Sequence, residues 1–125
     1  MAKVAIVRRD AGSHRHMAGR RTAAPWVPPV DVFETNRHYI VNAELAGVDR
    51  RDVRVEIAGN DVTICGRRRS APPCCDEQYS RVEGSHGWFH RSFSLPEALD
   101  RAPATALIED GLLQVRIEKP SPRRK

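Results

Sequence analysis

Apolar and polar residues alternate with a period of two along most of the chain after residue 30. The clearest runs are Tyr39–Leu45, Val53–Ile57 and Leu113–Ile117, in which every second residue is apolar. Successive side chains of a strand point to opposite faces, so this period predicts half-buried β-strands. The segment 47–52 is the best candidate for a helix, and it is long enough for one turn at most.

Turn-forming residues separate these runs at short intervals. Gly59-Asn60 stands between two apolar runs, and Asp110-Gly111 precedes the last one. Asn, Asp and Gly readily adopt the backbone angles that tight hairpin turns require. About seven or eight short strands joined by such turns, with no long helix, predict an all-β protein built as a β-sandwich.

The two ends of the chain lack this alternation. Residues 1–25 hold glycines and scattered arginines and histidines, so we expect a flexible N-terminal arm there. Pro28 and Pro29 then mark an extended entry into the domain, which we place at 26–119. Residues 120–125, Pro-Ser-Pro-Arg-Arg-Lys, predict a short disordered basic tail.

Charge is distributed unevenly along the chain. The formal net charge is +5, yet residues 1–21 and 119–125 are basic while the middle of the chain is acidic. A basic domain face would indicate nucleic-acid binding, and this sequence offers only basic tails. We therefore expect no specific nucleic acid as a partner. Weak, salt-sensitive nucleic-acid binding by the tails is kept as an alternative.

No apolar run approaches the roughly 20 residues that a membrane span needs. The apolar patch Val4–Val7 is also shorter than the core of a signal peptide, which is about 7–15 residues. These features predict a cytoplasmic protein without a membrane span. The three cysteines, Cys65, Cys74 and Cys75, are an odd number and are expected to be reduced there.

Motifs for catalysis or metal binding are missing from the sequence. Adjacent cysteines without a second pair do not give the ligand spacing of a zinc site. There is no G-x-S-x-G nucleophile motif and no Gly-rich phosphate loop. We expect no catalytic residue, no metal, no cofactor and no enzymatic activity.

Two blocks of sequence, in the same order, resemble the small heat-shock protein family through its α-crystallin domain. Residues 43–68, AELAGVDRRDVRVEIAGNDVTICGRR, look like two strands of that domain joined by a Gly-Asn turn. Residues 87–119 contain F-x-R-x-F-x-L-P and then A-x-x-x-D-G-x-L at the family's usual spacing. These two patterns are made by Phe89, Arg91, Phe93, Leu95, Pro96, Ala106, Asp110, Gly111 and Leu113. The resemblance extends over about 26–119.

The resemblance implies an immunoglobulin-like β-sandwich with an ATP-independent holdase activity. Such proteins bind unfolding client proteins and prevent their aggregation. The long segment 67–78 before Tyr79–Glu83 looks like the bacterial and plant form, in which a weak strand pairs with an edge strand of the partner subunit. A homodimer by strand exchange is therefore expected. Its interface residues would be Val30, Val32, Tyr79, Arg81, Val82, Glu83 and Arg91.

The resemblance also implies a client or partner groove between strands 53–57 and 104–108. Its lining residues would be Val53, Val55, Ile57, Ala104, Ala106 and Ile108. Arg91 is expected to pair with carboxylates near the dimer interface.

Members of the family often fill this groove with a C-terminal I-x-I motif, which builds large oligomers. The tail of this chain lacks such a motif. A homodimer, a larger oligomer and a co-oligomer with a paralogous small heat-shock subunit therefore all remain open. The alternative function is a dimeric interaction or scaffold module without chaperone activity of its own.

Overall fold

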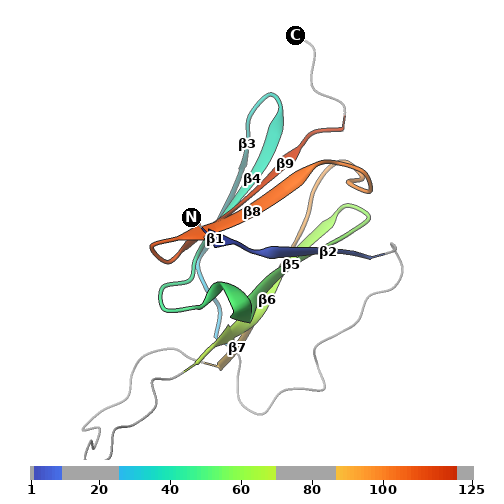
Figure 1. Ribbon diagram of the computed structural model, residues 1–125. Coiled ribbons are helices and arrows are strands. Elements are labelled where there is room, and N and C mark those ends of the chain that lie inside the picture. Colours follow the sequence, from blue (N-terminus) through green and yellow to red (C-terminus); the bar gives the residue numbers. More distant parts are fainter. Residues whose placement is uncertain (1, 10–25, 70–86, 121–125) are drawn as a thin grey trace, which may run out of the picture.

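The computed structural model describes residues 2–9, 26–69 and 87–120, which form two β-sheets packed face to face (Figure 1). The predicted β-sandwich is confirmed. One short 3-10 turn, η2 (Arg50–Asp52), lies in the segment for which a single helical turn was predicted. Asp49 caps it, because its side chain accepts a hydrogen bond from the Arg51 N–H.

The first sheet has five strands in the order β1-β8-β9-β4-β3, with all neighbours antiparallel. Its strands are β1 (Ala2–Lys3), β8 (Ala104–Glu109), β9 (Leu112–Glu118), β4 (His38–Glu44) and β3 (Val30–Glu34).

The second sheet has four strands in the order β2-β5-β6-β7. The pair β2–β5 is parallel, and the other two pairs are antiparallel. Its strands are β2 (Ala5–Arg9), β5 (Val53–Ala58), β6 (Asp61–Arg68) and β7 (Gly87–Ser94).

Both predicted hairpin turns are present. β5 and β6 are joined at Gly59-Asn60, and β8 and β9 at Asp110-Gly111. The φ angles of Asp110 and Gly111 are 54° and 79°. Positive φ at both central positions defines a type I′ turn, whose twist matches that of the flanking strands.

The inward-facing residues of both sheets form one hydrophobic cluster. Gly66 on β6 lies beside this cluster and is needed for close packing, because an added Cβ would lie 2.1 Å from the Asp52 carbonyl oxygen and 2.9 Å from the Phe89 ring. The fully buried members include Val41, Val55, Val62, Ile64, Phe89, Leu99, Leu113, Val115 and Ile117.

Residues 2–9 do not follow the prediction of a flexible arm. They form β1 and β2, whose partner strands lie far along the chain. Local composition cannot reveal a pairing of this kind, because the open strand edges that attract the segment exist only in the folded sandwich. The rest of the predicted arm, residues 10–25, lies outside the described residues, as do residues 121–125 of the predicted tail.

The edge strands of the two sheets lie side by side at two places, which we call the two ends of the sandwich. Each end is covered by one extended segment that contacts both sheets (Figure 1). We call residues 2–9 the N-terminal segment; its β1 pairs with β8 of the first sheet and its β2 with β5 of the second. We call residues 26–34 the entry segment. Its Trp26 bridges to Phe89 on β7, and its β3 pairs with β4. The two segments thus occupy opposite edges of the sheets.

Candidate interaction surfaces

The structure places the six predicted groove residues on β5 and β8, at the end closed by the N-terminal segment. All belong to the hydrophobic cluster or pack against it, and Ala104 is the one that is only partly buried. They are therefore covered in this conformation, and their role in binding a client stays a prediction. The residues are Val53, Val55, Ile57, Ala104, Ala106 and Ile108.

The N-terminal segment occupies the strand edges beside this predicted groove. Ala2 is in register with Ile108, and the Val4 N–H donates to the Ala106 carbonyl oxygen at 2.9 Å. Val4 is only 5% exposed and belongs to the hydrophobic cluster. Ile6 packs against the same cluster. Sequence reasoning missed this contact, and the one signal that could have indicated it is the short apolar patch Val4–Val7.

Arg8 ties the N-terminal segment to the turn that precedes β8. Its Nη1 donates to the carbonyl oxygens of Leu99 at 2.9 Å and Asp100 at 3.3 Å, and its Nη2 donates to that of Ala102. The turn is itself fixed, because the Leu99 N–H donates to the Gly59 carbonyl oxygen at 2.9 Å. One guanidinium thus satisfies three carbonyl groups, and we call this contact the Arg8 clamp.

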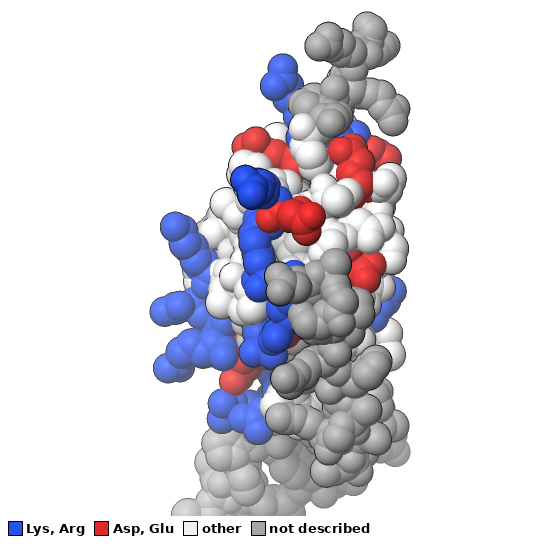
Figure 2. Space-filling view, turned by 90° about the vertical axis from the view of Figure 1, so that its right-hand side faces the viewer, with Lys and Arg blue, Asp and Glu red and all other residues white. Residues whose placement is uncertain are grey.

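Charged side chains also link the N-terminal segment to β5. Glu56 lies between two arginines, with Arg9 Nε at 3.2 Å and Arg54 Nη2 at 2.9 Å from its carboxylate. Figure 2 shows Lys and Arg side chains gathered down the middle and along one side of the molecule, with acidic side chains beside several of them. The Arg9–Glu56 ion pair, whose side chains are 30% and 16% exposed, helps to fix the position of β2 beside β5.

The opposite end of the sandwich presents the strand edge predicted for the dimer. Within the described residues, β3 pairs with β4 alone. Val30 packs against the hydrophobic cluster, whereas Val32 is 39% and Phe33 47% exposed. The predicted partner strand, Tyr79–Glu83, lies outside the described residues.

Arg91 holds the entry segment against β7. Its Nη1 donates to the Pro28 carbonyl oxygen at 2.9 Å, and its guanidinium lies over the Phe93 ring at 5.1 Å. The polar partner in the described part of the chain is therefore a backbone carbonyl group, where a carboxylate was predicted. The reason is that the proline-rich entry segment crosses β7 within reach of this long side chain. Carboxylate pairing near a dimer interface stays a prediction.

Trp26 fixes the start of the entry segment. Its Nε1 donates to the Gly87 carbonyl oxygen at 3.0 Å, and its ring lies 5.1 Å from that of Phe89. The Arg68 guanidinium lies 4.0 Å from the centre of the Trp26 ring. These contacts hold Trp26, and with it the start of the segment that leads into β3, against β7.

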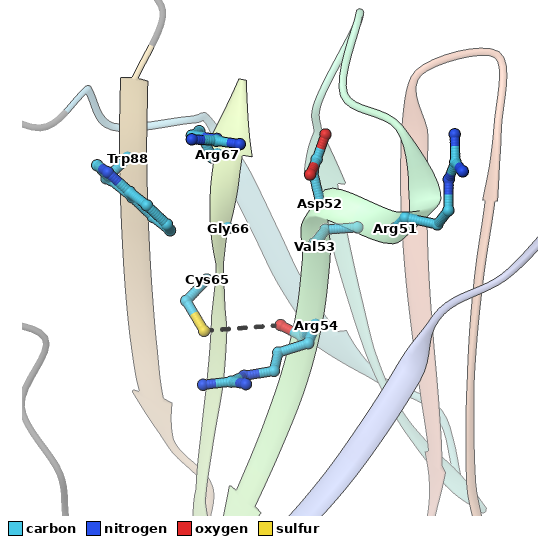
Figure 3. A pocket seen from close by; sticks show the side chains of 8 residues that line it. All are labelled: Arg51, Asp52, Val53, Arg54, Cys65, Gly66, Arg67 and Trp88. Carbon is cyan, nitrogen blue, oxygen red and sulfur yellow. Dashed lines mark hydrogen bonds between the residues drawn. The ribbon is translucent and has the colours of Figure 1, made fainter. Parts of the chain in front are cut away.

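A hollow of about 290 Å³ lies on β5–β7 and is rich in arginine (Figure 3). Several of its charged groups are engaged by neighbours: Asp52 accepts two hydrogen bonds from Arg69 at 2.8 Å, which lower the pKa of its carboxyl group. The Arg67 guanidinium lies 5.3 Å from the centre of the Trp88 ring. These contacts stabilise the surface around the hollow. The lining residues are Arg51, Asp52, Val53, Arg54, Cys65, Gly66, Arg67 and Trp88.

Cys65, which lines this hollow, is buried. Burial raises the pKa of its thiol, so the nucleophilic thiolate is disfavoured at neutral pH. Cys74 and Cys75 lie outside the described residues.

In the part of the chain that the structure describes, no group of three His, Cys, Asp or Glu residues is placed to hold a metal ion. Nor does that part contain a helix long and apolar enough to cross a membrane.

The sequence of this chain matches a family model and several known proteins. The model of the Hsp20/alpha crystallin family matches residues 31–125. The chain belongs to this family. It is 33% identical over 110 residues to spore protein SP21 of Stigmatella aurantiaca, a match that covers 88% of this chain and 65% of that protein. It is 37% identical over 101 residues to the 16.9 kDa class I heat shock protein 3 of rice, covering 80% and 68%.

A solved structure of a small heat-shock protein from Xylella fastidiosa, described as having a distinct high order structure, is also similar. Its TM-score is 0.64 at 35% identity, and the match covers 82% of this chain and 96% of that one. The family match begins at residue 31, so the N-terminal segment lies outside it. The end of the sandwich at β5 and β8 is therefore covered by residues that the family pattern does not describe.

Proposed function

We propose that this Hsp20 family member is an ATP-independent chaperone, which binds unfolding proteins and prevents their aggregation by binding and not by catalysis. Membership of the family and the heat shock names of its relatives support this function. Binding of this kind uses the burial of apolar surface, which requires no nucleotide.

The observation that carries the proposal is the strand edge at β3. Within the described residues its outer side is unpaired, and it carries the exposed side chains of Val32 and Phe33. A free edge with apolar side chains accepts an extended peptide through backbone hydrogen bonds and side-chain contacts. Both a second copy of the chain and an unfolded client offer such peptides.

The assembly unit in this proposal is a homodimer made by strand exchange. Tyr79–Glu83 of one copy would pair with β3 of the other, in the region of Val30 and Val32. Arg91 lies nearby, where it holds the entry segment that leads into β3. Assembly beyond the dimer, with itself or with a paralogous subunit, would use other contacts.

The first test measures light scattering by an aggregation-prone protein on heating, with and without this chain, in the absence of nucleotide. We expect suppression near equimolar ratios and no change on adding ATP. Full aggregation at several-fold excess of the chain would contradict the proposal. It would favour an interaction module, or a subunit that needs a paralogue.

A second test concerns the dimer. Val82→Pro removes a backbone donor from the exchanged strand, so the mass in solution should fall to that of a monomer. Val27→Ser is the control, because Val27 is 64% exposed and lies outside the strands. An unchanged mass of the Val82→Pro variant would refute the strand-exchanged dimer.

A further inference from the structure

The N-terminal segment is shaped as a docking peptide for the groove between β5 and β8. Its residues alternate between two environments: Ala2, Val4 and Ile6 contact the hydrophobic cluster, whereas Lys3 and Ala5 are exposed. Such alternation is what an extended peptide needs to bury one side against a core. The segment therefore carries its own recognition pattern.

The backbone of the segment covers two strand edges at once. β1 is antiparallel to β8, and β2 is parallel to β5, so the chain crosses from one sheet to the other at Val4. Removing residues 2–9 would expose both edges together with the apolar side chains between them. An unfolding protein offers the same kind of ligand, namely an extended segment with alternating apolar residues.

Beyond the backbone pairing of β1 and β2, a small number of side-chain contacts hold the segment, and the Arg8 clamp is prominent among them. The segment has one apolar side chain that is nearly fully buried, that of Val4. The clamp adds three hydrogen bonds from a charged group to the carbonyl oxygens of Leu99, Asp100 and Ala102. Hydrogen bonds of this type are stronger than those between neutral groups.

From these observations we infer that the N-terminal segment is a reversible plug, which closes the β5–β8 groove against clients and is retained by the Arg8 clamp. The occupant is residues 2–9 of the same chain, and the recognised pattern is Val-x-Ile-x-Arg. Because the plug and the groove belong to the same chain, its binding is intramolecular, and a client must compete with it. The effect on clients rests on the proposed chaperone function.

Hydrogen exchange of the full chain tests the plug without any client. Val4→Asp places a charge in the buried position and should release the segment. Amides of β8 and β5 should then exchange about tenfold faster or more, while those of β9 and β6 stay protected. Ala5→Asp is the matched control, because it adds the same charge to the exposed neighbour. It should leave exchange unchanged.

A synthetic peptide with the sequence of residues 2–9 separates plug release from a folding defect. Added to the Val4→Asp variant, it should restore protection of β5 and β8. The same peptide with Arg8→Ala should bind about tenfold more weakly or worse, because it loses the clamp. Equal binding of both peptides would overturn the role assigned to Arg8.

The effect on clients is measured with the same two variants. Val4→Asp should suppress aggregation at a lower chain-to-client ratio than the parent chain, and Ala5→Asp should match the parent. Unchanged exchange in Val4→Asp would overturn the plug. Faster exchange without stronger suppression would overturn competition with clients, while the parent's own suppression would leave the chaperone proposal standing. Protection of β8 that is lost on dilution would overturn the intramolecular occupant in favour of a second copy.

Discussion

The two ends of the sandwich are covered by similar extended segments, but these leave different surfaces exposed. In both, an extended segment contacts the two sheets in turn, and an arginine donates to backbone carbonyl groups. Arg8 reaches from the N-terminal segment to the turn at 99–102, whereas Arg91 reaches from β7 to Pro28 of the entry segment. The N-terminal segment leaves β5 and β8 covered. The entry segment ends in β3, whose outer side is unpaired within the described residues.

This difference separates two kinds of binding. At β3 the outer side is unpaired within the described residues and the Phe33 side chain is exposed, so we expect a second chain to add a strand directly. At β5 and β8 the strand edges are already paired with the N-terminal segment, so we expect a ligand to bind there only after displacing it. We therefore expect dimer assembly at β3 to need no structural change, whereas binding of a ligand at β5 and β8 requires release of the N-terminal segment.

The largest expected effect comes from the core that both ends share. Phe89 is fully buried and contacts Trp26, so Phe89→Ala should cost about 3–5 kcal/mol of unfolding free energy, measured with denaturant. Both ends should lose hydrogen-exchange protection together. Trp88→Ala, at the partly exposed neighbouring position, should cost clearly less. Faster hydrogen exchange in the entry segment alone would contradict this prediction, because it would show that the two ends do not depend on a shared core.

A smaller and more local effect is expected from Arg91→Ala. It removes the hydrogen bond to Pro28 and the contact with the Phe93 ring, which should cost about 1–3 kcal/mol. Exchange should become faster in residues 26–34 and stay unchanged in residues 2–9. Arg91→Lys, which keeps the charge, should recover part of the loss. Equal loosening of both segments would contradict the separation of the two ends.

The unmodified chain provides a third comparison. In dilute solution the outward amides of β3 should exchange quickly, whereas those of β8 are protected by β1 and β9. Raising the protein concentration should protect β3, because a second copy then pairs with it, and leave β8 as it was. Protection of β3 at every concentration would show that its edge is covered within one chain.

The smallest expected effect is a pH dependence at the start of β5. The hydrogen bonds from Arg69 lower the pKa of Asp52 below the ordinary value of 3.8. A carboxyl group whose pKa is lower in the folded state stabilises the fold above its unfolded pKa, and this contribution is lost as the pH falls through the folded pKa. Asp52→Asn should therefore weaken the loss of stability below about pH 4, measured by urea unfolding. An identical acid profile for both chains would contradict this role.

Sequence alone was sufficient for the strands whose alternation reports burial. Val53–Ile57 and Leu113–Ile117 lie in β5 and β9 as predicted, because one face of each strand packs into the core wherever its partners come from. The Asp110-Gly111 turn was equally predictable, since positive φ at both positions restricts the choice of residue.

The closing contacts could not be predicted in the same way. Val4 stands in a short apolar patch, but its partner Ala106 lies about a hundred residues away, and no local sequence pattern identifies that partner. Arg8 and Arg91 are long side chains whose partners are carbonyl groups, which every residue possesses. Such contacts depend on which backbone passes within reach, and only the folded chain determines that.

The register of β1 sets an order of events during synthesis. Glu34 pairs with Tyr39, so the β3–β4 hairpin can form soon after these residues leave the ribosome. Ala2 must wait for Ile108, which at about 5–20 residues per second takes roughly 5–20 s. For that interval Ala2 and Val4 are without their partners on β8, while the edge of β3 is already built. A nascent chain is therefore able to meet a second copy before its own N-terminal end is closed.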